Sequence, residues 1–539
     1  MKPTQLSWVV FCALAAALGL SNFWLPAPLP ASAAPTLFSA ARALEHVKAI
    51  AQAPHPAASA ENRRVREYVL AQMRELALKP RAIEGQQSGV KLVNLYGELE
   101  GTQPAKPPIL LVTHYDSTPN GPGAADDATG VATILETVRA IEARGPLRNR
   151  IGILITDGEE LGLMGAKAFI RDQPDLWRDV RLVVNLEARG NHGPVLMFET
   201  GRDNGGLIRL FSQACPVPVA ASFSQDIYRR MPNDTDFTVF MNAGKRGFNF
   251  SFVGGLAYYH SPQDTPANLS LRTLQHYGSC LLPLTAQLGQ ADDQALERYL
   301  SPGDATFFPL WRGRLAHYSS GLAWGLALAT AGLFAIVLGQ GFWRSTVRVK
   351  AVAISLGVSL LTAVLTMGMG TAVVFGLVRL FRSRNDGPFV IGLPFDGVFL
   401  AGLLLMAATV TLGLRAWLLR NAKPNEGLAG SLMVWVSLTV AAAWTLPGAS
   451  CLFVWPALCG TLALLFSDAR GPGAGGTSLF LVLLTAAPAP WLLAPTILLL
   501  HQAITIGIAP ISMGFVALAI CLMPLRPASK PITPSPAPP

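Results

Sequence analysis

The sequence predicts an α/β domain with a mostly parallel sheet flanked by helices, followed by an all-α, multi-span transmembrane domain. Three observations predict this. Hydrophobic residues make up 51% of the 539 residues and charged residues 14%, which is apolar for a soluble protein. Between about residues 36 and 300, short strand-like runs alternate with helical stretches. From about residue 318 onward, long apolar runs follow one another.

The first 35 residues are predicted to be a signal anchor or a signal peptide with a Pro/Ala linker. Residues Leu6 to Leu25 are mostly apolar and follow a single Lys2. A Pro/Ala stretch with the small residues Ala31-Ser32-Ala33 comes next, as at a cleavage site. The apolar run is long enough to span a membrane, which favours the anchor. Either segment would carry the following residues across a membrane.

Residues 36–310 are predicted to form the α/β domain. Helical periodicity covers residues 36–53, 60–78 and 131–142. The strand-like runs are Ile109–Thr113, Ile151–Thr156, Leu182–Leu186, Val195–Phe198 and Phe248–Phe252. Because helices separate several of these strands, the sheet is expected to be mostly parallel and covered on both faces.

Residues 318–525 are predicted to form a transmembrane domain of about seven helices. The expected spans are 320–342, 351–378, 394–414, 428–448, 451–467, 477–499 and 504–524. The Pro-rich residues 526–539 are expected to form a disordered tail. Membrane lipid is therefore an expected partner.

Basic residues predict the orientation in the membrane. From Ala316 to the end there are 12 Lys/Arg and 4 Asp/Glu, so most of the net charge of +9 lies around the spans. This distribution argues against a nucleic-acid partner. Three basic segments are expected in the cytoplasm, namely residues 344–350, residues 415–423 and the tail with Arg526 and Lys530. The α/β domain is then extracytoplasmic: periplasmic or outside in a bacterium, luminal in a eukaryote. The loop with Arg379, Arg382 and Arg384 opposes this orientation.

Only two of the six cysteines, Cys215 and Cys280, lie in the α/β part of the sequence. In an oxidising compartment they would form a disulfide. The alternative is two buried thiols. The sequence leaves both open.

Five segments at or just after predicted strand ends carry residues that suit metal binding. They are Thr113–Asp116, Gly123–Gly130, Asp157–Gly162, Asn185–Ala188 and Tyr258–Thr265. Side chains beyond the carboxyl ends of strands face a crevice. Zinc accepts imidazole nitrogen and carboxylate oxygen. Two histidines and three carboxylates would hold two zinc ions if one carboxylate bridges them, and paired ions activate a shared water.

Taken singly, most of these segments have an ordinary structural explanation. Asp126 or Asp127 would serve as the N-cap of the following helix. The Glu159-Glu160 pair is typical of a solvated turn. Glu187 is harder to explain, because a carboxylate at a strand end is poorly placed for a core. All five segments in this order indicate a single site.

These segments resemble those of metallopeptidase family 28. The resemblance covers roughly residues 40 to 295 and includes Pro54-His55-Pro56 near its start. The segment Pro232–Phe237 and the trailing membrane domain are similar to the branch of endoplasmic reticulum metallopeptidases and vacuolar membrane proteases. The resemblance implies a zinc aminopeptidase-like fold and two Zn²⁺ ions.

The resemblance also implies roles for single residues. Asp126 would bridge the two zinc ions, Glu160 and His260 would complete one site, and His114 and Glu187 would complete the other. In many aminopeptidases of the family the residue at the position of Glu187 is an aspartate. The longer side chain still reaches a metal, but it leaves aminopeptidase specificity less certain than peptidase chemistry.

The remaining implied roles belong to residues beside these ligands. Glu159 would take a proton from the activated water and pass it to the leaving amine. Asp116 would orient His114. Tyr259 would donate to the oxyanion, with Tyr258 as its rival for that role. Asp264 is a further candidate for a supporting role.

The expected function is therefore that of a membrane-anchored zinc metallopeptidase, which hydrolyses peptide substrates and removes their N-terminal residues. Three alternatives stay open: a non-catalytic receptor or scaffold, glutaminyl cyclisation, and transport through the membrane domain. For transport, Asp396 is the one acidic residue that deserves a test. The sequence does not determine the oligomeric state.

Overall fold

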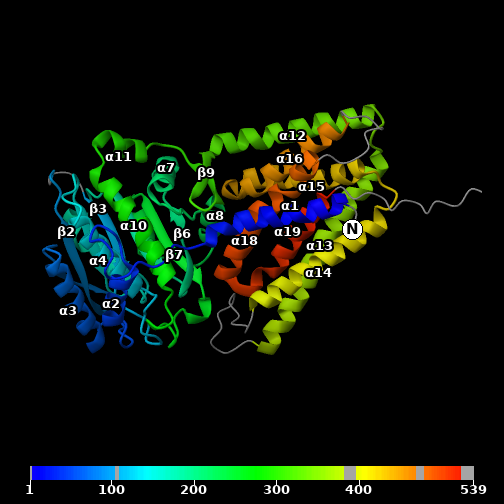
Figure 1. The fold of residues 1–539 in the computed structure, drawn as a ribbon. Coiled ribbons are helices and arrows are strands. Elements are labelled where there is room, and N and C mark those ends of the chain that lie inside the picture. Colours follow the sequence, from blue (N-terminus) through cyan, green and yellow to red (C-terminus); the bar gives the residue numbers. More distant parts are fainter. Residues whose placement is uncertain (1–2, 104–107, 382–395, 469–478, 524–539) are drawn as a thin grey trace, which may run out of the picture. The chain divides into compact units, whose positions relative to one another are not determined.

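The computed structural model describes residues 3–103, 108–381, 396–468 and 479–523, and the chain divides into two compact units (Figure 1). The sheet unit comprises Leu20–Ala323 together with Leu446–Ala449. The helical unit comprises Met1–Gly19, Trp324–Thr445 and Ser450–Pro539. The predicted Pro-rich tail, residues 526–539, and the loop residues Arg382 and Arg384 lie outside the described residues.

The described residues of the sheet unit form a seven-stranded sheet in the order β1-β2-β4-β3-β5-β7-β6. Its strands are β1 (Arg81–Gln87), β2 (Val90–Leu99), β3 (Ile109–His114), β4 (Ile151–Thr156), β5 (Leu182–Ala188), β6 (His192–Thr200) and β7 (Gly247–Gly254). The central strands β4, β3, β5 and β7 run parallel, whereas β1, β2 and β6 pair antiparallel. The sheet is therefore mixed, with a parallel centre.

Helices cover both faces of this sheet (Figure 1). One face packs against α2 (Ala40–Ile50), α3 (Ala60–Glu75), α4 (Ala128–Glu142), α7 (Gly205–Ala214) and α10 (Leu271–Gln290). The opposite face packs against α5 (Met164–Asp172) and α9 (Asp236–Asn242). Strands β3, β4 and β5 are buried along their whole lengths, as expected for parallel strands between two helical layers. The predicted fold class is confirmed.

Four strands escaped the sequence prediction. Strands β1 and β2 form an antiparallel hairpin, and most of β1 is exposed or half-buried and polar, so its apolar pattern is weak. A second hairpin, β8 (Ala305–Trp311) with β9 (Arg314–Ser319), runs from the end of the predicted α/β domain into the start of the predicted transmembrane domain. The smaller helices are α6 (Pro174–Trp177), α8 (Ser222–Tyr228), η2 (Leu256–Tyr258) and α11 (Asp293–Tyr299).

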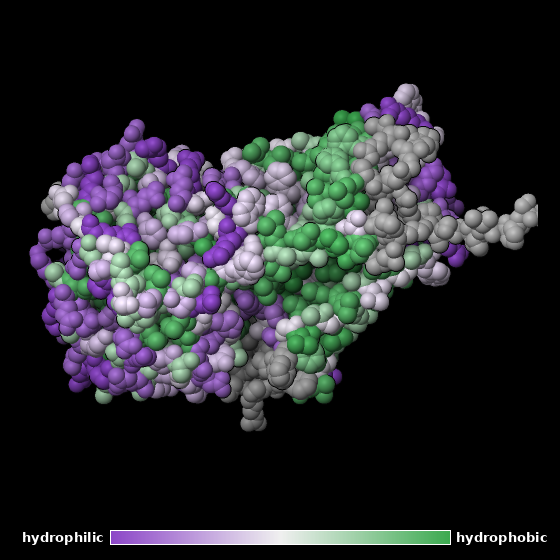
Figure 2. Space-filling model, in the orientation of Figure 1, coloured by the Kyte–Doolittle hydropathy of each residue, from purple (hydrophilic) through white to green (hydrophobic). Residues whose placement is uncertain are grey.

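The helical unit consists of long apolar helices, and Figure 2 shows a mostly hydrophobic surface over them. They are α1 (Pro3–Leu20), α12 (Ser320–Trp343), α13 (Val349–Phe381), α14 (Asp396–Leu418), α15 (Pro424–Thr445), α16 (Cys451–Asp468), α17 (Leu479–Ala486), α18 (Pro488–Ile504) and α19 (Ala509–Cys521). Within the described residues, six helical stretches are long and apolar enough to cross a membrane, and one of them is the N-terminal Leu6–Phe23.

The end of this unit differs from the predicted spans. The span expected at 477–499 is divided between α17 and α18, because Pro488 begins a new helix. The span expected at 504–524 begins as the 3₁₀ turn η4 (Thr505–Ile508) before α19. Asp396 is the first residue of α14, with an oxygen 3.5 Å from His501 Nε2, so it lies at a helix end rather than in mid-span. Nothing at Asp396 therefore indicates a transport pathway.

Candidate metal centre

The predicted ligands lie at the carboxyl ends of the parallel strands. The register pairs His114, the last residue of β3, with Thr156, the last residue of β4. Glu159 and Glu160 follow directly in the turn after β4, and Glu187 is the penultimate residue of β5. Asp126 lies just before α4. Parallel strands end at one edge of a sheet, which is why segments far apart in sequence meet here.

The first group of candidate ligands is His114, Asp126 and Glu187, which we call the buried group. His114 Nε2 lies 3.2 Å from Asp126 Oδ1 and 3.7 Å from Glu187 Oε2. All three residues are buried. Their ligand atoms lie within 4.8 Å of one another, as the donors of one metal ion would.

The second group is Asp126, Glu160 and His260, which we call the open group. His260 Nε2 lies 3.2 Å from Asp126 Oδ2 and 3.0 Å from Glu160 Oε1. The His260 side chain is 34% exposed, in contrast to that of His114, which is 1% exposed. Asp126 belongs to both groups and turns one oxygen toward each histidine, which is the arrangement of a bridging carboxylate.

The orientation of His114 is fixed by a main-chain carbonyl. Its Nδ1 lies 2.9 Å from the Asp116 carbonyl oxygen, which only accepts, so Nδ1 carries the proton. The other ring nitrogen, Nε2, faces Asp126 and Glu187 and would be the ligand atom of the neutral ring. The expectation was that the Asp116 carboxylate would hold this imidazole, but Asp116 Oδ1 is 3.6 Å from Nδ1. That carboxylate instead accepts from the main-chain N–H groups of Glu159, at 3.0 Å, and Glu160, at 3.3 Å.

Two further aspartates hold the loop that carries Asp126. Asp127 is the N-cap of α4 and accepts from the Gly130 N–H at 2.9 Å, so the capping role falls to Asp127 and leaves Asp126 free for the site. Asp264 accepts from the N–H groups of Ala125, at 2.7 Å, and Asp126, at 3.3 Å. The supporting role expected of Asp264 is thus directed at the Asp126 loop.

Two residues that the sequence did not point to hold Glu187. The Tyr277 hydroxyl, on α10, accepts from the Glu187 N–H at 2.9 Å. Asn185 Nδ2 donates to Glu187 Oε1 at 3.3 Å. The one available signal was an asparagine inside the otherwise apolar strand β5. Tyr277 is 90 residues further along the chain and gave no signal.

Glu159 and Tyr259 lie beside the two groups. Burial, and then the negative charge of Glu187, raises the pKa of Glu159 well above its usual range. The Tyr259 ring stacks on His260 with ring centroids 3.7 Å apart. Burial, and then the charges of Asp126 and Glu160, raises the pKa of the Tyr259 hydroxyl, which therefore stays protonated and able to donate. Its rival, Tyr258, lies in η2.

The donor set fits divalent cations that accept nitrogen and oxygen, as zinc does. Burial, and then the charge of Asp126, raises the pKa of Glu160 to about 7, although the neighbouring His260 lowers it. Glu160 Oε1 and His260 Nε2 are buried and form no hydrogen bond with the described residues, although they lie 3.0 Å apart. Two unpaired donor atoms directed at a common point are what a metal ion would satisfy.

Comparison with known proteins bears on this site. Residues 94–285, which contain both ligand groups, match the model of peptidase family M28. We call this matched segment the M28 domain, after the family that it resembles. The match extends from β2 into α10 and so includes every strand of the parallel centre.

The M28 domain is similar to those of membrane-associated relatives. Endoplasmic reticulum metallopeptidase 1 of Mus musculus is 31% identical over 222 residues, which cover 40% of this chain and 24% of the mouse protein. Vacuolar membrane protease of Candida dubliniensis is 28% identical over 243 residues, covering 42% of this chain and 26% of that protein. The match thus spans about a quarter of these relatives. In this chain, the apolar helices outside the matched segment have the length and composition of membrane spans.

Solved structures that resemble the M28 domain include a zinc aminopeptidase from Bacillus subtilis. It is 15% identical with a TM-score of 0.39, and the match covers 48% of this chain and 97% of the aminopeptidase. A glutaminyl cyclase from Porphyromonas gingivalis is 17% identical, also with a TM-score of 0.39, and the match covers 47% of this chain and 99% of the cyclase.

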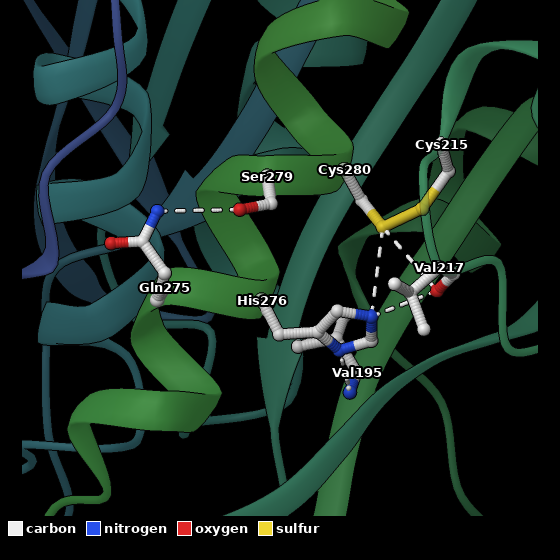
Figure 3. Close-up of a disulfide and its surroundings, with 7 residues drawn as sticks. All are labelled: Val195, Cys215, Val217, Gln275, His276, Ser279 and Cys280. Atoms are coloured by element: carbon white, nitrogen blue, oxygen red, sulfur yellow. Dashed lines mark hydrogen bonds between the residues drawn. A yellow bond between two sulfur atoms is a disulfide. The ribbon is translucent and has the colours of Figure 1, made fainter. Parts of the chain in front are cut away.

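Cys215 and Cys280 of the M28 domain form a disulfide beside His276 (Figure 3). His276 Nδ1 accepts from the Val195 N–H at 3.0 Å, and its Nε2 donates to the Val217 carbonyl at 2.8 Å. Both ring nitrogens are therefore used, and burial lowers the pKa of His276 to about 4, so the ring is neutral. Of the two possibilities left by the sequence, the structure has the disulfide. This cluster offers no lone pair to a metal ion.

Proposed function

We propose that the chain is a membrane-anchored zinc metallopeptidase that removes N-terminal residues from peptides. In this proposal the buried group and the open group each hold one zinc ion, and Asp126 bridges the two. The observation that carries the proposal is the placement of Asp126, whose two oxygens each lie 3.2 Å from a different histidine nitrogen. Such sharing is hard to explain as ordinary core packing, because buried carboxylates are expensive without compensating charge.

Two zinc ions, when bound, would polarise the scissile carbonyl and lower the pKa of a water molecule. Glu159 would accept a proton from the attacking water and deliver it to the leaving amine. Its main chain is fixed by the Asp116 carboxylate, so the base is held in a set position next to Glu160. The protonated Tyr259 hydroxyl would donate to the oxyanion as the tetrahedral intermediate forms.

We place the catalytic domain outside the cytoplasm. The Cys215–Cys280 disulfide supports this, because such bonds persist in oxidising compartments. The apolar stretch Leu6–Phe23 near the N-terminus supports it too, since it would carry the sheet unit across the membrane. Labelling of an engineered surface cysteine by a membrane-impermeant reagent, with the chain expressed in bacterial spheroplasts, tests this side; protection until lysis would place the domain inside.

The non-catalytic alternative is weakened by the complete set of ligand residues and by Glu159 beside them. A receptor or scaffold that keeps only the fold has no need for a base next to two ligand groups. Glutaminyl cyclisation is distinguished from cleavage by its product. Mass spectrometry of Gln-initiated peptides would show loss of ammonia for cyclisation and loss of a residue for cleavage.

The test of the proposed function uses the full chain purified in detergent. We expect zinc-dependent release of N-terminal residues from a mixed peptide library, and the Glu159→Gln variant to lose this activity while keeping its metal. Glu67→Gln is the matched control, because Glu67 is an exposed glutamate on α3, remote in sequence from the ligands. A zinc-loaded, folded protein that cleaves no peptide in the library would refute the proposal.

A further inference from the structure

One buried carboxylate of the sheet belongs to neither ligand group. Glu199, near the end of β6, is 2% exposed. Asn249 Nδ2, on β7, donates to Glu199 Oε2 at 3.0 Å. Burial raises the pKa of Glu199 to about 7, although the hydrogen bond from Asn249 and the charge of Arg229 lower it. Glu199 is therefore a buried acid without a buried cationic partner among the described residues.

A fixed chain of amide hydrogen bonds connects Glu199 to the buried group. Asn185 Nδ2 donates to Glu187 Oε1, at 3.3 Å, and to Asn249 Oδ1, at 3.0 Å. Asn249 Nδ2 in turn donates to Glu199 and, at 2.9 Å, to Thr235 Oγ1. Because both asparagines are fully buried, this chain sets Glu199 at a fixed position relative to the proposed zinc ligand Glu187.

Two buried oxygen atoms near this chain of hydrogen bonds can accept a further hydrogen bond. Asn185 Oδ1 forms no hydrogen bond with any residue in the described part of the chain. The Tyr228 hydroxyl interacts with Thr235 and keeps a second lone pair. Tyr228 lies beside Thr235, and burial, then the charges of Glu199 and Glu187, raises the pKa of its hydroxyl. The hydroxyl thus lies in the field of both carboxylates. An unpaired buried acceptor such as Asn185 Oδ1 is available to a donor that the chain itself does not supply.

The surrounding atoms favour a cation as the bound group. A positive charge nearby would favour the ionised form of Glu199, Asn185 Oδ1 only accepts, and the Tyr228 oxygen accepts as readily as it donates. A group with several N–H donors and a positive charge would satisfy all three. Arg229 is exposed, so an incoming cation would not have to displace a buried partner.

The distance between Glu199 and the ligand groups indicates which part of a substrate would carry this cation. One strand, β7, separates β6 from β5, so Glu199 lies about 10 Å across the sheet from the Glu187 strand. The α-amine of a substrate is only about 2.5 Å from the carbonyl carbon that must lie at the ligand groups. A lysine side chain carries its charge about 6 Å beyond the α-carbon, and an arginine side chain slightly further.

We propose that Glu199, with Asn185 and Tyr228, selects peptides whose N-terminal residue is lysine or arginine. The ammonium or guanidinium of that residue would donate to the Glu199 carboxylate, to Asn185 Oδ1 and to the Tyr228 oxygen. This proposal rests on the proposed aminopeptidase function and specifies its substrate class. Charge-assisted hydrogen bonds of this kind are strong enough to select between substrates of similar size.

The test compares lysyl and Nε-acetyl-lysyl fluorogenic amides with the full chain in detergent. Acetylation keeps the lysine skeleton, replaces its ammonium by a neutral amide and adds an acetyl group, so a norleucyl amide serves as the smaller neutral substrate. We expect kcat/KM to be at least about tenfold higher for the lysyl amide, and the Glu199→Gln variant to abolish that ratio. Tyr228→Phe should reduce the ratio several-fold, mainly through KM. Glu67→Gln should keep the wild-type ratio, and zinc content and thermal unfolding verify that each variant is folded.

The outcomes separate this proposal from the proposed function. If the wild-type chain cleaves leucyl and Nε-acetyl-lysyl amides as well as the lysyl amide, the aminopeptidase stands and the assignment of Glu199 is wrong. A Glu199→Gln variant that slows all amides equally would give this residue a structural role and also overturn the assignment. If the zinc-loaded wild type cleaves no amide, the aminopeptidase function itself fails, and the substrate class fails with it.

Discussion

The buried and open groups offer matching donors but differ in how they are supported. His114 ends a buried strand, and its Nδ1 is held by the Asp116 carbonyl. His260 lies in a loop after η2, is one-third exposed, has a left-handed φ of 55° and is supported on one side by the stacked Tyr259 ring. A non-glycine residue at positive φ persists where its surroundings demand it, often at functional sites.

This difference in support predicts that the two groups bind and exchange zinc differently. The buried group is preorganised and sheltered from water, so it should hold its zinc tightly. The open group presents its ligands toward solvent and should exchange zinc more readily. An incoming substrate would reach the site from this side. The comparison makes predictions that differ between the two groups.

The largest effect is expected for a residue that belongs to neither group. Glu159→Gln should lower kcat by about 10³-fold, since positioned proton transfer contributes about 10²–10⁴-fold. Because Glu159 is not a proposed ligand, both groups should keep their zinc. Steady-state kinetics and elemental analysis of the same preparation measure the two quantities. Loss of zinc in this variant would mean that the proposed base is a ligand.

The next effect distinguishes the groups directly. His260→Ala should release one zinc per chain and leave the other bound, with affinity at the open group falling by more than about 100-fold, because outer partners alone account for about 10–100-fold. His114→Ala should release zinc from the buried group and weaken the bridge at Asp126 as well. Competition with a chelator measures both affinities. Equal behaviour of the two variants would remove the distinction drawn between the groups.

A smaller effect is expected for Asp116, which contacts residues of both groups. Asp116→Asn replaces one of the carboxylate oxygens that accept from the N–H groups of Glu159 and Glu160, while the carbonyl that holds His114 remains. We expect kcat to fall by about 10–100-fold and zinc to be weakened mainly at the open group. If zinc binding at the buried group were weakened instead, that result would indicate that the Asp116 carboxylate orients His114 in solution.

The disulfide should affect stability more than either ligand group. Replacing Cys215 and Cys280 by alanine opens a link between residues 65 apart in sequence and should lower the free energy of unfolding by about 2–5 kcal/mol. Zinc content should stay unchanged at moderate temperature. Denaturant unfolding of the detergent-solubilised chain, with and without reductant, measures the change. A wild-type chain that is insensitive to reductant after unfolding would indicate that the bond is not formed.

The smallest effect is a pH dependence from His276. Its pKa is lowered from 6.5 to about 4 in the folded chain, so the unfolded chain binds the proton more readily between these values. Its contribution to stability is complete above about pH 6.5 and is lost as the pH falls toward 4, by at most about 3 kcal/mol. In His276→Gln this part of the pH dependence should disappear. Unfolding curves at pH 7 and pH 4.5 for both proteins measure it.

The sequence predicted the parts of the site that depend on strand ends. A histidine or carboxylate that follows a buried strand is visible in the sequence, and the structure brings together His114, Asp126, Glu160, Glu187 and His260 from five such segments. Their roles as ligands remain predictions. The capping aspartate was visible too, although the choice between Asp126 and Asp127 needed the geometry of α4.

Residues that act across the fold were not predictable from the sequence. Tyr277 and Asn249 contact the site through hydrogen bonds that span 90 and 64 residues, and no local pattern marks such partners. Strand β1 was missed because its polar side chains hide its pairing. The break before Pro488 was visible as a proline, but the apolar run around it outweighed that signal.

The central claim is that two zinc ions lie in unequal groups that share Asp126. The most direct test is the zinc content of the full detergent-purified chain, followed over time after a chelator is added. We predict two zinc ions per chain, one lost quickly and one slowly, with His260→Ala lacking the fast phase. A single ion per chain, none at all, or two ions lost together would contradict this account.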